Sequence, residues 1–130
     1  MSSMITLDIT LYGIAHCDTV KKARAWLAAQ EQAHHFHDFK KQGVPAERLA
    51  VWMADVGWER LVNRQGTTWR KLDAATQAAV QDAASASALL QAHTSLIKRP
   101  VVEWRRGAGT RTTVGFDAAV WAQLVHGAPD

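Results

Sequence analysis

Several features that define whole classes of protein are scarce in this chain of 130 residues. It has a single cysteine, which excludes an internal disulfide and suits a reducing compartment. It has only three prolines and no low-complexity segment, so collagen-like and disordered classes are excluded. No apolar run approaches the roughly 20 residues of a membrane-spanning helix, and the first residues lack the pattern of a signal peptide. We therefore expect a cytoplasmic protein that does not associate with membranes.

The composition that remains is typical of one globular domain. Hydrophobic residues make up 48% of the chain and charged residues 21%, and domains of about 100–150 residues are common. The net charge is +3, and basic residues gather at 60–71 and 98–111. This bias favours an anionic ligand or partner, although a solvated basic face would give the same pattern. No DNA-binding motif is present, so we expect no direct binding of nucleic acid.

The apolar periodicity of the first 40 residues predicts a strand, a helix and a second strand. Residues 5–12 alternate between apolar and polar side chains, as in a half-buried strand. Residues 19–30 carry apolar side chains at helical spacing, with Thr19 or Asp18 as the expected N-cap. Residues 34–39 are long enough for a short second strand. This order predicts a parallel β-α-β unit.

The rest of the chain predicts helices, then a hairpin, then a last helix. The expected segments are helices at 46–56, 73–84 and 87–93 (the last two capped by Asp73 and Ser87), strands at 100–104 and 110–114, and a helix capped by Asp117 and ended by Gly127 and Pro129. Trp26, Trp52 and Trp121 fall on predicted core faces. We therefore predict an α/β, thioredoxin-like fold: a single domain over 1–130, with a mixed four-stranded sheet and a helical insertion at 45–95.

Cys17 lies where the first strand gives way to the first helix. Unpaired N–H groups and the helix dipole favour an anion there, so the pKa of the thiol is expected to be lowered. Lys21 and Lys22, one turn further on, would add positive charge. The alternative is a buried and unreactive cysteine. Since Val20 stands where a C-x-x-C partner would be, an external thiol, with glutathione as the obvious candidate, must resolve any adduct of Cys17.

Arg99 and Pro100 form the second candidate feature. A proline suits the start of a strand, because it cannot donate a hydrogen bond to the ladder. In a thioredoxin-like fold, the Arg99–Pro100 bond can be cis and can lie opposite Cys17. The forked donors of Arg99 would then meet an oxyanion. An ordinary strand start is the alternative.

Several histidines could bind a metal ion or assist Cys17. On a strand, His35 and His37 share one face while His34 points away, and no further ligand has suitable spacing. We therefore predict no metal site. His16, next to Cys17, could tune the thiol or transfer a proton, although adjacent side chains often diverge.

Three ordered motifs resemble those of the ArsC-related proteins, in particular the YffB subgroup. They are LYGIAHCDTVKKA at 11–23, LIKRPVV at 96–102 and VGF at 114–116. The resemblance implies a thioredoxin-like domain with an inserted helical subdomain, a cytoplasmic bacterial protein, no bound cofactor and a nucleophilic Cys17. Family members similar to arsenate reductase attack arsenate with this cysteine and resolve the adduct with glutathione and glutaredoxin.

The same resemblance implies that Arg99 binds the anion. In arsenate reductases two further arginines complete the anion site, and Arg60 and Arg111 are candidates for them only because they lie in the basic stretches of the sequence. An Asn-Pro pair typical of arsenate reductases is missing before Cys17, and the YffB subgroup is instead linked to glutathione-dependent thiol reduction. We therefore predict a thiol-dependent oxidoreductase that acts on a small anionic or disulfide substrate. Its catalytic residues would be Cys17 and Arg99, and its candidate substrate- or glutathione-binding residues are Lys21, Lys22, Pro100, Arg60 and Arg111. The alternative is a binding module similar to Spx, a regulator that contacts RNA polymerase and carries the C-x-x-C switch that Val20 removes here.

Overall fold

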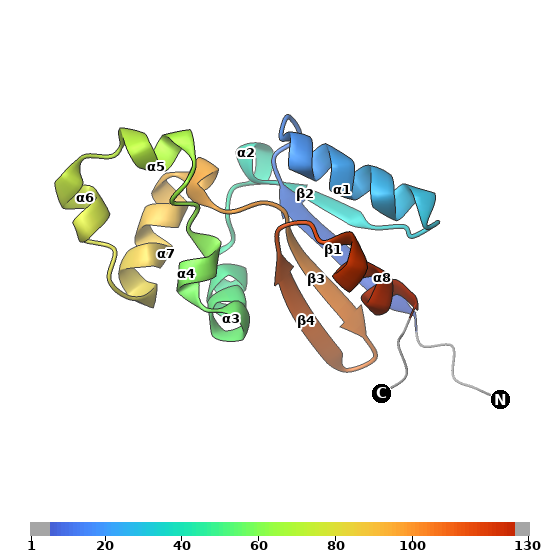
Figure 1. Cartoon of the computed structure of the whole chain (residues 1–130). Helices are drawn as coiled ribbons and strands as arrows, with labels where there is room; N and C mark the ends of the chain where they lie inside the picture. Colours follow the sequence, from blue (N-terminus) through green and yellow to red (C-terminus); the bar gives the residue numbers. More distant parts are fainter. Residues whose placement is uncertain (1–5, 127–130) are drawn as a thin grey trace. The chain divides into compact units, whose positions relative to one another are not determined.

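The computed structural model describes residues 6–126, which form two compact units (Figure 1). The sheet unit consists of the chain up to Asp38 and from Arg99 onward, and the helical unit spans Phe39–Lys98. A helix begins at Phe39 directly after the second strand, and the predicted helical insertion at 45–95 falls within this unit. Within residues 6–126, no helix combines the length and the apolar character needed to cross a bilayer.

The sheet unit is built on four strands in the order β2-β1-β3-β4. The strands are β1 (Leu7–Gly13), β2 (His35–Asp38), β3 (Val101–Arg106) and β4 (Gly109–Val114). β1 pairs parallel with β2 and antiparallel with β3, and β3 pairs antiparallel with β4. The predicted mixed sheet of a thioredoxin-like fold is therefore confirmed, including the parallel pair and the hairpin.

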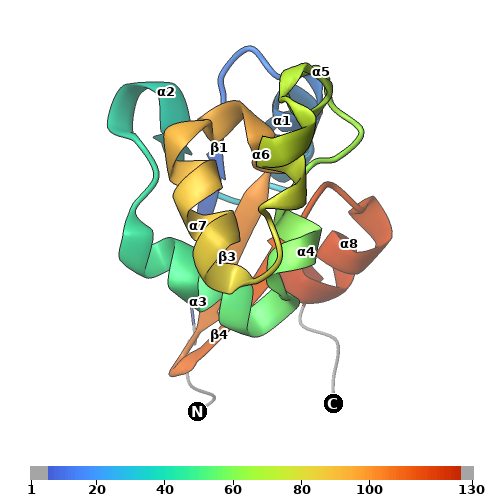
Figure 2. The ribbon, with the colours of Figure 1, turned by 90° about the vertical axis from the view of Figure 1, so that its left-hand side faces the viewer.

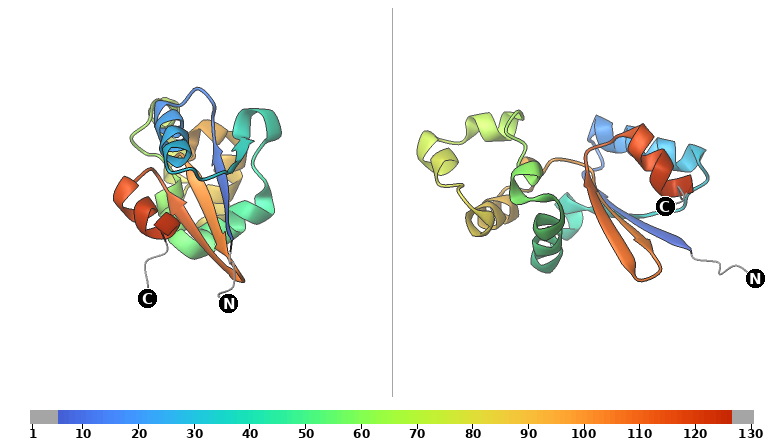
Figure 3. Two further views of the ribbon diagram at one scale, coloured as in Figure 1. Left: turned by 90° about the vertical axis from the view of Figure 1, so that its right-hand side faces the viewer. Right: turned by 60° about the horizontal axis from the view of Figure 1, so that its bottom comes forward.

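Two helices, α1 (Asp18–Ala29) and α8 (Ala118–His126), lie on the same face of this sheet (Figure 3). Alternate side chains of β1 and β3 point toward them, and the buried cluster comprises Ile9, Leu11, Val20, Ala23, Leu27, Val102, Trp104 and Trp121. Trp121 is 1% exposed, and Trp26, Trp104 and Phe116 pack edge-on around it. Trp121 was thus correctly placed in the core, while Trp26 is half-buried at its margin. As expected, Asp117 caps α8: its carboxylate accepts hydrogen bonds from the N–H groups of Ala119 and Val120.

The helical unit contains short helices joined by tight connections (Figure 2). They are α2 (Phe39–Gln42), α3 (Ala46–Val56), α4 (Trp58–Leu61), α5 (Thr67–Lys71), α6 (Ala74–Ala78), α7 (Ala83–Ala92) and the 3₁₀ turn η1 (Thr94–Leu96). α7 packs against α3 and α4. Helix 46–56 is confirmed, and Trp52 is fully buried as predicted.

The predicted helices at 73–84 and 87–93 were wrong in their boundaries. Asp73 does cap a helix, but α6 ends at Ala78 and the next helix already begins at Ala83. The reason is a capping box at the start of α7. The Asp82 carboxylate accepts a hydrogen bond from the Ser85 N–H, and the Ser85 hydroxyl accepts one from the Asp82 N–H. Ser87, the expected cap, therefore lies inside α7. Gly127 and Pro129, the expected helix stop, lie outside the described residues.

Candidate active site

Cys17 itself is the N-cap of α1, so the expectation that Thr19 or Asp18 would cap this helix was wrong. Its backbone is extended, with φ −81° and ψ 125°, and its carbonyl accepts the first helical hydrogen bond from the Lys21 N–H at 2.9 Å. The turn after β1 is closed by the Cys17 N–H, which donates to the Ile14 carbonyl at 3.1 Å. Because that turn delivers the chain to the helix one residue earlier, the polar side chains of Asp18 and Thr19 are exposed in the first turn.

A close approach between β1 and α1 fixes the position of this turn. A Cβ on Gly13 would lie 2.7 Å from Cγ2 of Val20, so only glycine lets the strand end pack this tightly on the helix. Val20 is fully buried in the sheet-unit core, and the half-buried Cys17 packs against the same core. The thiol is therefore held at the carboxyl end of β1, next to the first N–H groups of α1.

Arg99 reaches Cys17 through the pairing of β1 with β3. Val101, the first residue of β3, lies opposite Tyr12 near the end of β1, so the residues that precede β3 meet those that follow β1. The Arg99–Pro100 peptide bond is cis, and the Pro100 ring is buried. The guanidinium of Arg99 forms a hydrogen bond with the Cys17 thiol. The structure thus brings together the two residues that the sequence predicted to be catalytic.

The pKa of the Cys17 thiol is set by opposing effects and is lowered overall. Partial burial is the largest single effect, and it raises the pKa because it disfavours the thiolate. It is outweighed by the Val20 N–H, by the hydrogen bond and the positive charge of Arg99, and by the Thr19 N–H. The thiol makes no standard capping hydrogen bond, yet the N–H groups of the first turn lie close enough to favour its anion.

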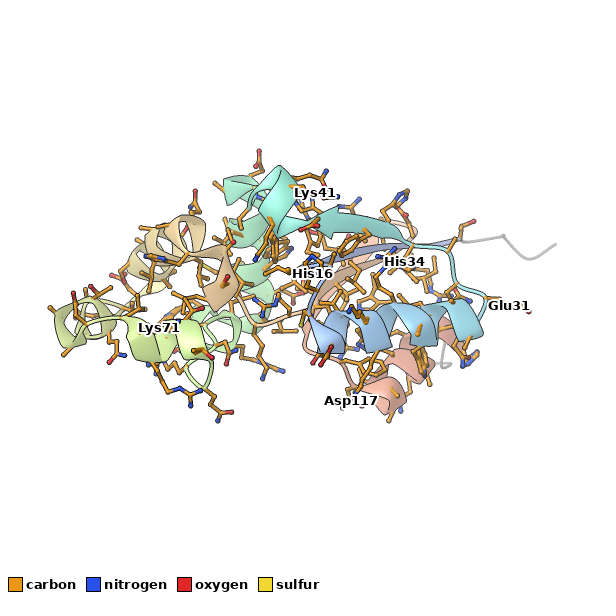
Figure 4. All side chains as sticks on the ribbon, turned by 90° about the horizontal axis from the view of Figure 1, so that it is seen from above. His16, Glu31, His34, Lys41, Lys71 and Asp117 are labelled. Atoms are coloured by element: carbon orange, nitrogen blue, oxygen red, sulfur yellow. The ribbon has the colours of Figure 1, made fainter. Side chains whose placement is uncertain are left out.

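Lys21 and Lys22 lie on the exposed side of α1, and Arg99 rather than either lysine supplies the charge that lowers the pKa of Cys17. His16 is exposed in the turn that leads into α1 (Figure 4). The sequence predicted that first-turn N–H groups act on the thiol, and the structure identifies them as those of Val20 and Thr19. The sequence did not show that the tight turn after Gly13 makes Cys17 itself the start of the helix.

The other two arginines named as binding candidates belong to other elements of the chain. Arg60 belongs to the helical unit, where it lines a polar pocket of about 260 Å³ with Arg64 and Lys98. Arg111 lies on β4 opposite Trp104, three residues before the pair Val114–Val101 that marks the Cys17 end of the sheet. That separation is about 10 Å along the strand, and Arg111 lines a pocket with Leu7 at the other end. The structure therefore does not place Arg111 with Cys17.

The histidines are engaged in local contacts. Arg24 of α1 donates to Nε2 of His34 at 3.1 Å. His34 directly precedes β2 (Figure 4). His35 lies 3.3 Å from the Asp8 carboxylate, and the ring of His37 packs on Tyr12 at 5.0 Å between centroids. Over residues 6–126, the structure forms no cluster of three or more His, Cys, Asp or Glu side chains that could hold a metal ion.

Comparison with known proteins gives consistent matches over most of the chain. The ArsC family model matches residues 12–124. A solved structure of a YffB protein is 47% identical, with a TM-score of 0.81, and the match covers 89% of this chain and 97% of that one. An arsenate reductase (ArsC) related protein from Brucella melitensis is 46% identical, with a TM-score of 0.67 and coverage of 88% and 91%.

A curated relative from Haemophilus influenzae, described as an uncharacterized protein, is 42% identical over 94 residues, which cover 72% of this chain and 82% of the relative. The matched region of the family model contains Cys17, Arg99 and Pro100. The chain therefore belongs to the ArsC family, a family of arsenate reductase-like, thiol-dependent oxidoreductases.

Proposed function

We propose that the protein is a thiol reductase in which Cys17 is the nucleophile and glutathione is the co-substrate. The observation that carries this proposal is the setting of Cys17, whose pKa is lowered by the N–H groups of α1 and by Arg99 against the effect of burial. A thiolate is the reactive form of cysteine in both disulfide exchange and attack on oxyanions. At neutral pH a larger fraction of Cys17 is therefore in this reactive form than of an unperturbed thiol.

The proposed reaction with a disulfide substrate has two exchange steps. The Cys17 thiolate attacks one substrate sulfur, forms a mixed disulfide with it and expels the other sulfur as a thiolate. A glutathione thiolate then attacks the substrate-derived sulfur of this mixed disulfide and releases the Cys17 thiolate. The product is a disulfide between glutathione and that half of the substrate, and a second glutathione reduces it to a free thiol and oxidised glutathione. Two glutathione molecules thus supply the two electrons, which a chain with a single cysteine cannot provide by itself.

Arg99 has two roles in this proposal. It stabilises the Cys17 thiolate before attack, and its remaining donors bind an anionic group of the substrate or a carboxylate of glutathione. Lys21 and Lys22, exposed on the first turns of α1, offer further positive charge to glutathione, while the buried Pro100 supports Arg99 from the chain that follows. We also propose that Arg60 binds a carboxylate within the helical unit, in the pocket that Glu59, Arg64 and Lys98 also line.

The first test is the alkylation rate of Cys17 as a function of pH. We expect the midpoint to lie below that of an ordinary thiol, and Arg99→Met to move it to higher pH because both a hydrogen bond and a positive charge are lost. Arg70→Met is the matched control, since Arg70 is an exposed arginine of α5 in the helical unit. Identical pH profiles for Arg99→Met and the wild type would contradict the proposal.

The second test is turnover with glutathione, using hydroxyethyl disulfide and arsenate in parallel. We expect turnover of the disulfide to be abolished in Cys17→Ser, and a mixed disulfide between Cys17 and the mercaptoethanol half of the substrate to be visible by mass spectrometry of the wild type. Turnover of arsenate alone would redirect the proposal to arsenate reduction. If neither substrate turns over and no adduct forms, the catalytic proposal fails and a binding module is the remaining interpretation.

A further inference from the structure

A second pocket lies in the sheet unit, at the end of the sheet away from Cys17. It has a volume of about 280 Å³, and the apolar side chains of Leu7, Trp104 and Leu124 contribute to its wall. Trp104 is almost fully buried, and its indole N–H donates to the Thr113 hydroxyl at 2.9 Å, which fixes the ring. Leu7 is the first residue of β1, whereas Cys17 follows the last one. Seven residues of strand, about 20 Å, therefore separate the two sites.

Two arginines complete the wall of this pocket. Arg111 lies opposite Trp104 in the β3–β4 pair, and Arg106 lies two residues beyond Trp104 on the same face of β3. Arg106 donates through Nη2 to the Leu124 carbonyl at 2.9 Å, which ties the hairpin to α8. The side chain of Arg111 makes no hydrogen bond and no ion pair with any residue from 6 to 126. Of the residues that the structure describes, no acidic one lines the pocket, so none of them offers the two arginines a carboxylate there.

We propose that this pocket binds a small carboxylate that carries an apolar, preferably aromatic, body. The apolar walls and the fixed indole of Trp104 suit a ring, because aromatic groups pack favourably edge to face or offset. The Arg111 guanidinium suits a carboxylate, which it can bind through two parallel hydrogen bonds. At about 280 Å³, the pocket is slightly smaller than the roughly 300–1,000 Å³ common for drug-sized ligands, so it suits a smaller ligand of about one ring. The proposal does not depend on the chemistry of Cys17.

Binding is tested on the full chain by ¹H–¹⁵N NMR, with phenylacetate as the probe and phenylacetamide as its uncharged counterpart. We expect phenylacetate to shift the indole N–H resonance of Trp104 and the backbone resonances of Leu7 and Thr110 in a saturable way, in the millimolar range. Phenylacetamide should bind at least tenfold more weakly, because it keeps the ring and loses the charge-assisted hydrogen bonds.

The decisive variant is Arg111→Gln, with Arg70→Gln as a control that makes the same change of charge outside the pocket. Arg111→Gln is expected to weaken phenylacetate binding about tenfold or more and to leave the Cys17 alkylation profile unchanged, whereas Arg70→Gln should bind like the wild type. The proposal is overturned if the Trp104 resonance does not move, if both probes bind equally, or if both variants lose affinity to the same extent. In the last case, binding would reflect overall charge alone.

Discussion

Replacing Trp121 should test whether one aromatic cluster holds the layer that carries Cys17. The Trp121 ring is 1% exposed and makes edge-on contacts with Phe116 at 4.8 Å, Trp104 at 5.1 Å and Trp26 at 6.0 Å between centroids. These partners come from β3, from the segment before α8 and from α1, whose first turn faces the thiol. Loss of the ring therefore removes a contact shared by both helices and the sheet.

The expected cost follows from burial and from these pairs. Trp121→Ala should lower the free energy of unfolding by about 4 kcal/mol, since truncation of a buried aromatic side chain typically costs about 3–5 kcal/mol. Because whole domains are stable by only about 5–15 kcal/mol, the milder Trp121→Phe is the safer variant, with an expected cost of about 1.5 kcal/mol. Trp121→Leu and Phe116→Leu should be coupled by about 0.5–1.5 kcal/mol in a double-mutant cycle.

Urea unfolding followed by far-UV circular dichroism measures these changes without relying on tryptophan emission, which the substitutions alter. A second probe, near-UV circular dichroism, checks that unfolding is two-state in a chain with two compact units. Trp58→Phe is the matched control, because Trp58 is half-buried in the helical unit and its ring lies 5.8 Å from the Arg64 guanidinium carbon. If Trp121→Phe costs no more than Trp58→Phe, or if the Phe116 cycle shows no coupling, the cluster does not have the role inferred here.

Two further predictions concern the turn at Cys17 and the cap of α7. Gly13→Ala should lower the free energy of unfolding by about 1–3 kcal/mol, measured in urea, because its Cβ would meet the buried Val20 at 2.7 Å; an unchanged stability would refute the tight packing of β1 on α1. At Asp82, the N–H and hydroxyl of Ser85 lower the pKa of the carboxyl. A lowered pKa in the folded state means that the stabilisation is present above the unfolded pKa and is lost as pH falls through the folded one. The stability difference between wild type and Asp82→Asn should therefore be largest near neutral pH and shrink below about pH 4; a difference that grows in acid would contradict this account.

The strands and the long helices could be predicted because their burial patterns are local. Residues 5–12 alternate since one face of β1 is buried, and the same periodicity identified α1, α3 and α8. The alanine-rich middle could not be divided correctly, because alanine favours a helix at every position and gives no apolar stripe. There the boundaries depend on Asp82 and Ser85, whose reciprocal hydrogen bonds define a start that propensity alone does not mark.

Buried polar groups are the part of the fold that is hardest to predict from the sequence. Glu103 is fully buried in the middle of β3, where its Oε1 accepts hydrogen bonds from the Tyr12 hydroxyl at 3.1 Å and from Arg105 at 2.9 Å. The alternation of β3 does place Glu103 on the face opposite Val102 and Trp104, and a carboxylate in that position is expected to be exposed. Its burial depends on partners from two strands, which only the tertiary structure brings into contact.

The same distinction between local and distant information explains why Lys21 and Lys22 were expected to add charge near the thiol, while Arg99 was expected to meet an oxyanion. The lysines are four and five residues from Cys17, and a helix turn can bring such neighbours close. Arg99 is 82 positions away in the sequence, yet the register Tyr12–Val101 makes the chain before β3 adjacent to the chain after β1. The lysines lie on the exposed side of α1, whereas the half-buried Arg99 is held by the buried Pro100 and by the pairing of β3. A partly buried and fixed guanidinium acts on the thiolate with little screening by water, while the mobile ammonium groups of the lysines are strongly screened. For this reason Cys17 and Arg99 could both be named from the sequence, but the direct effect of Arg99 on the pKa of the thiol could be identified only through the sheet.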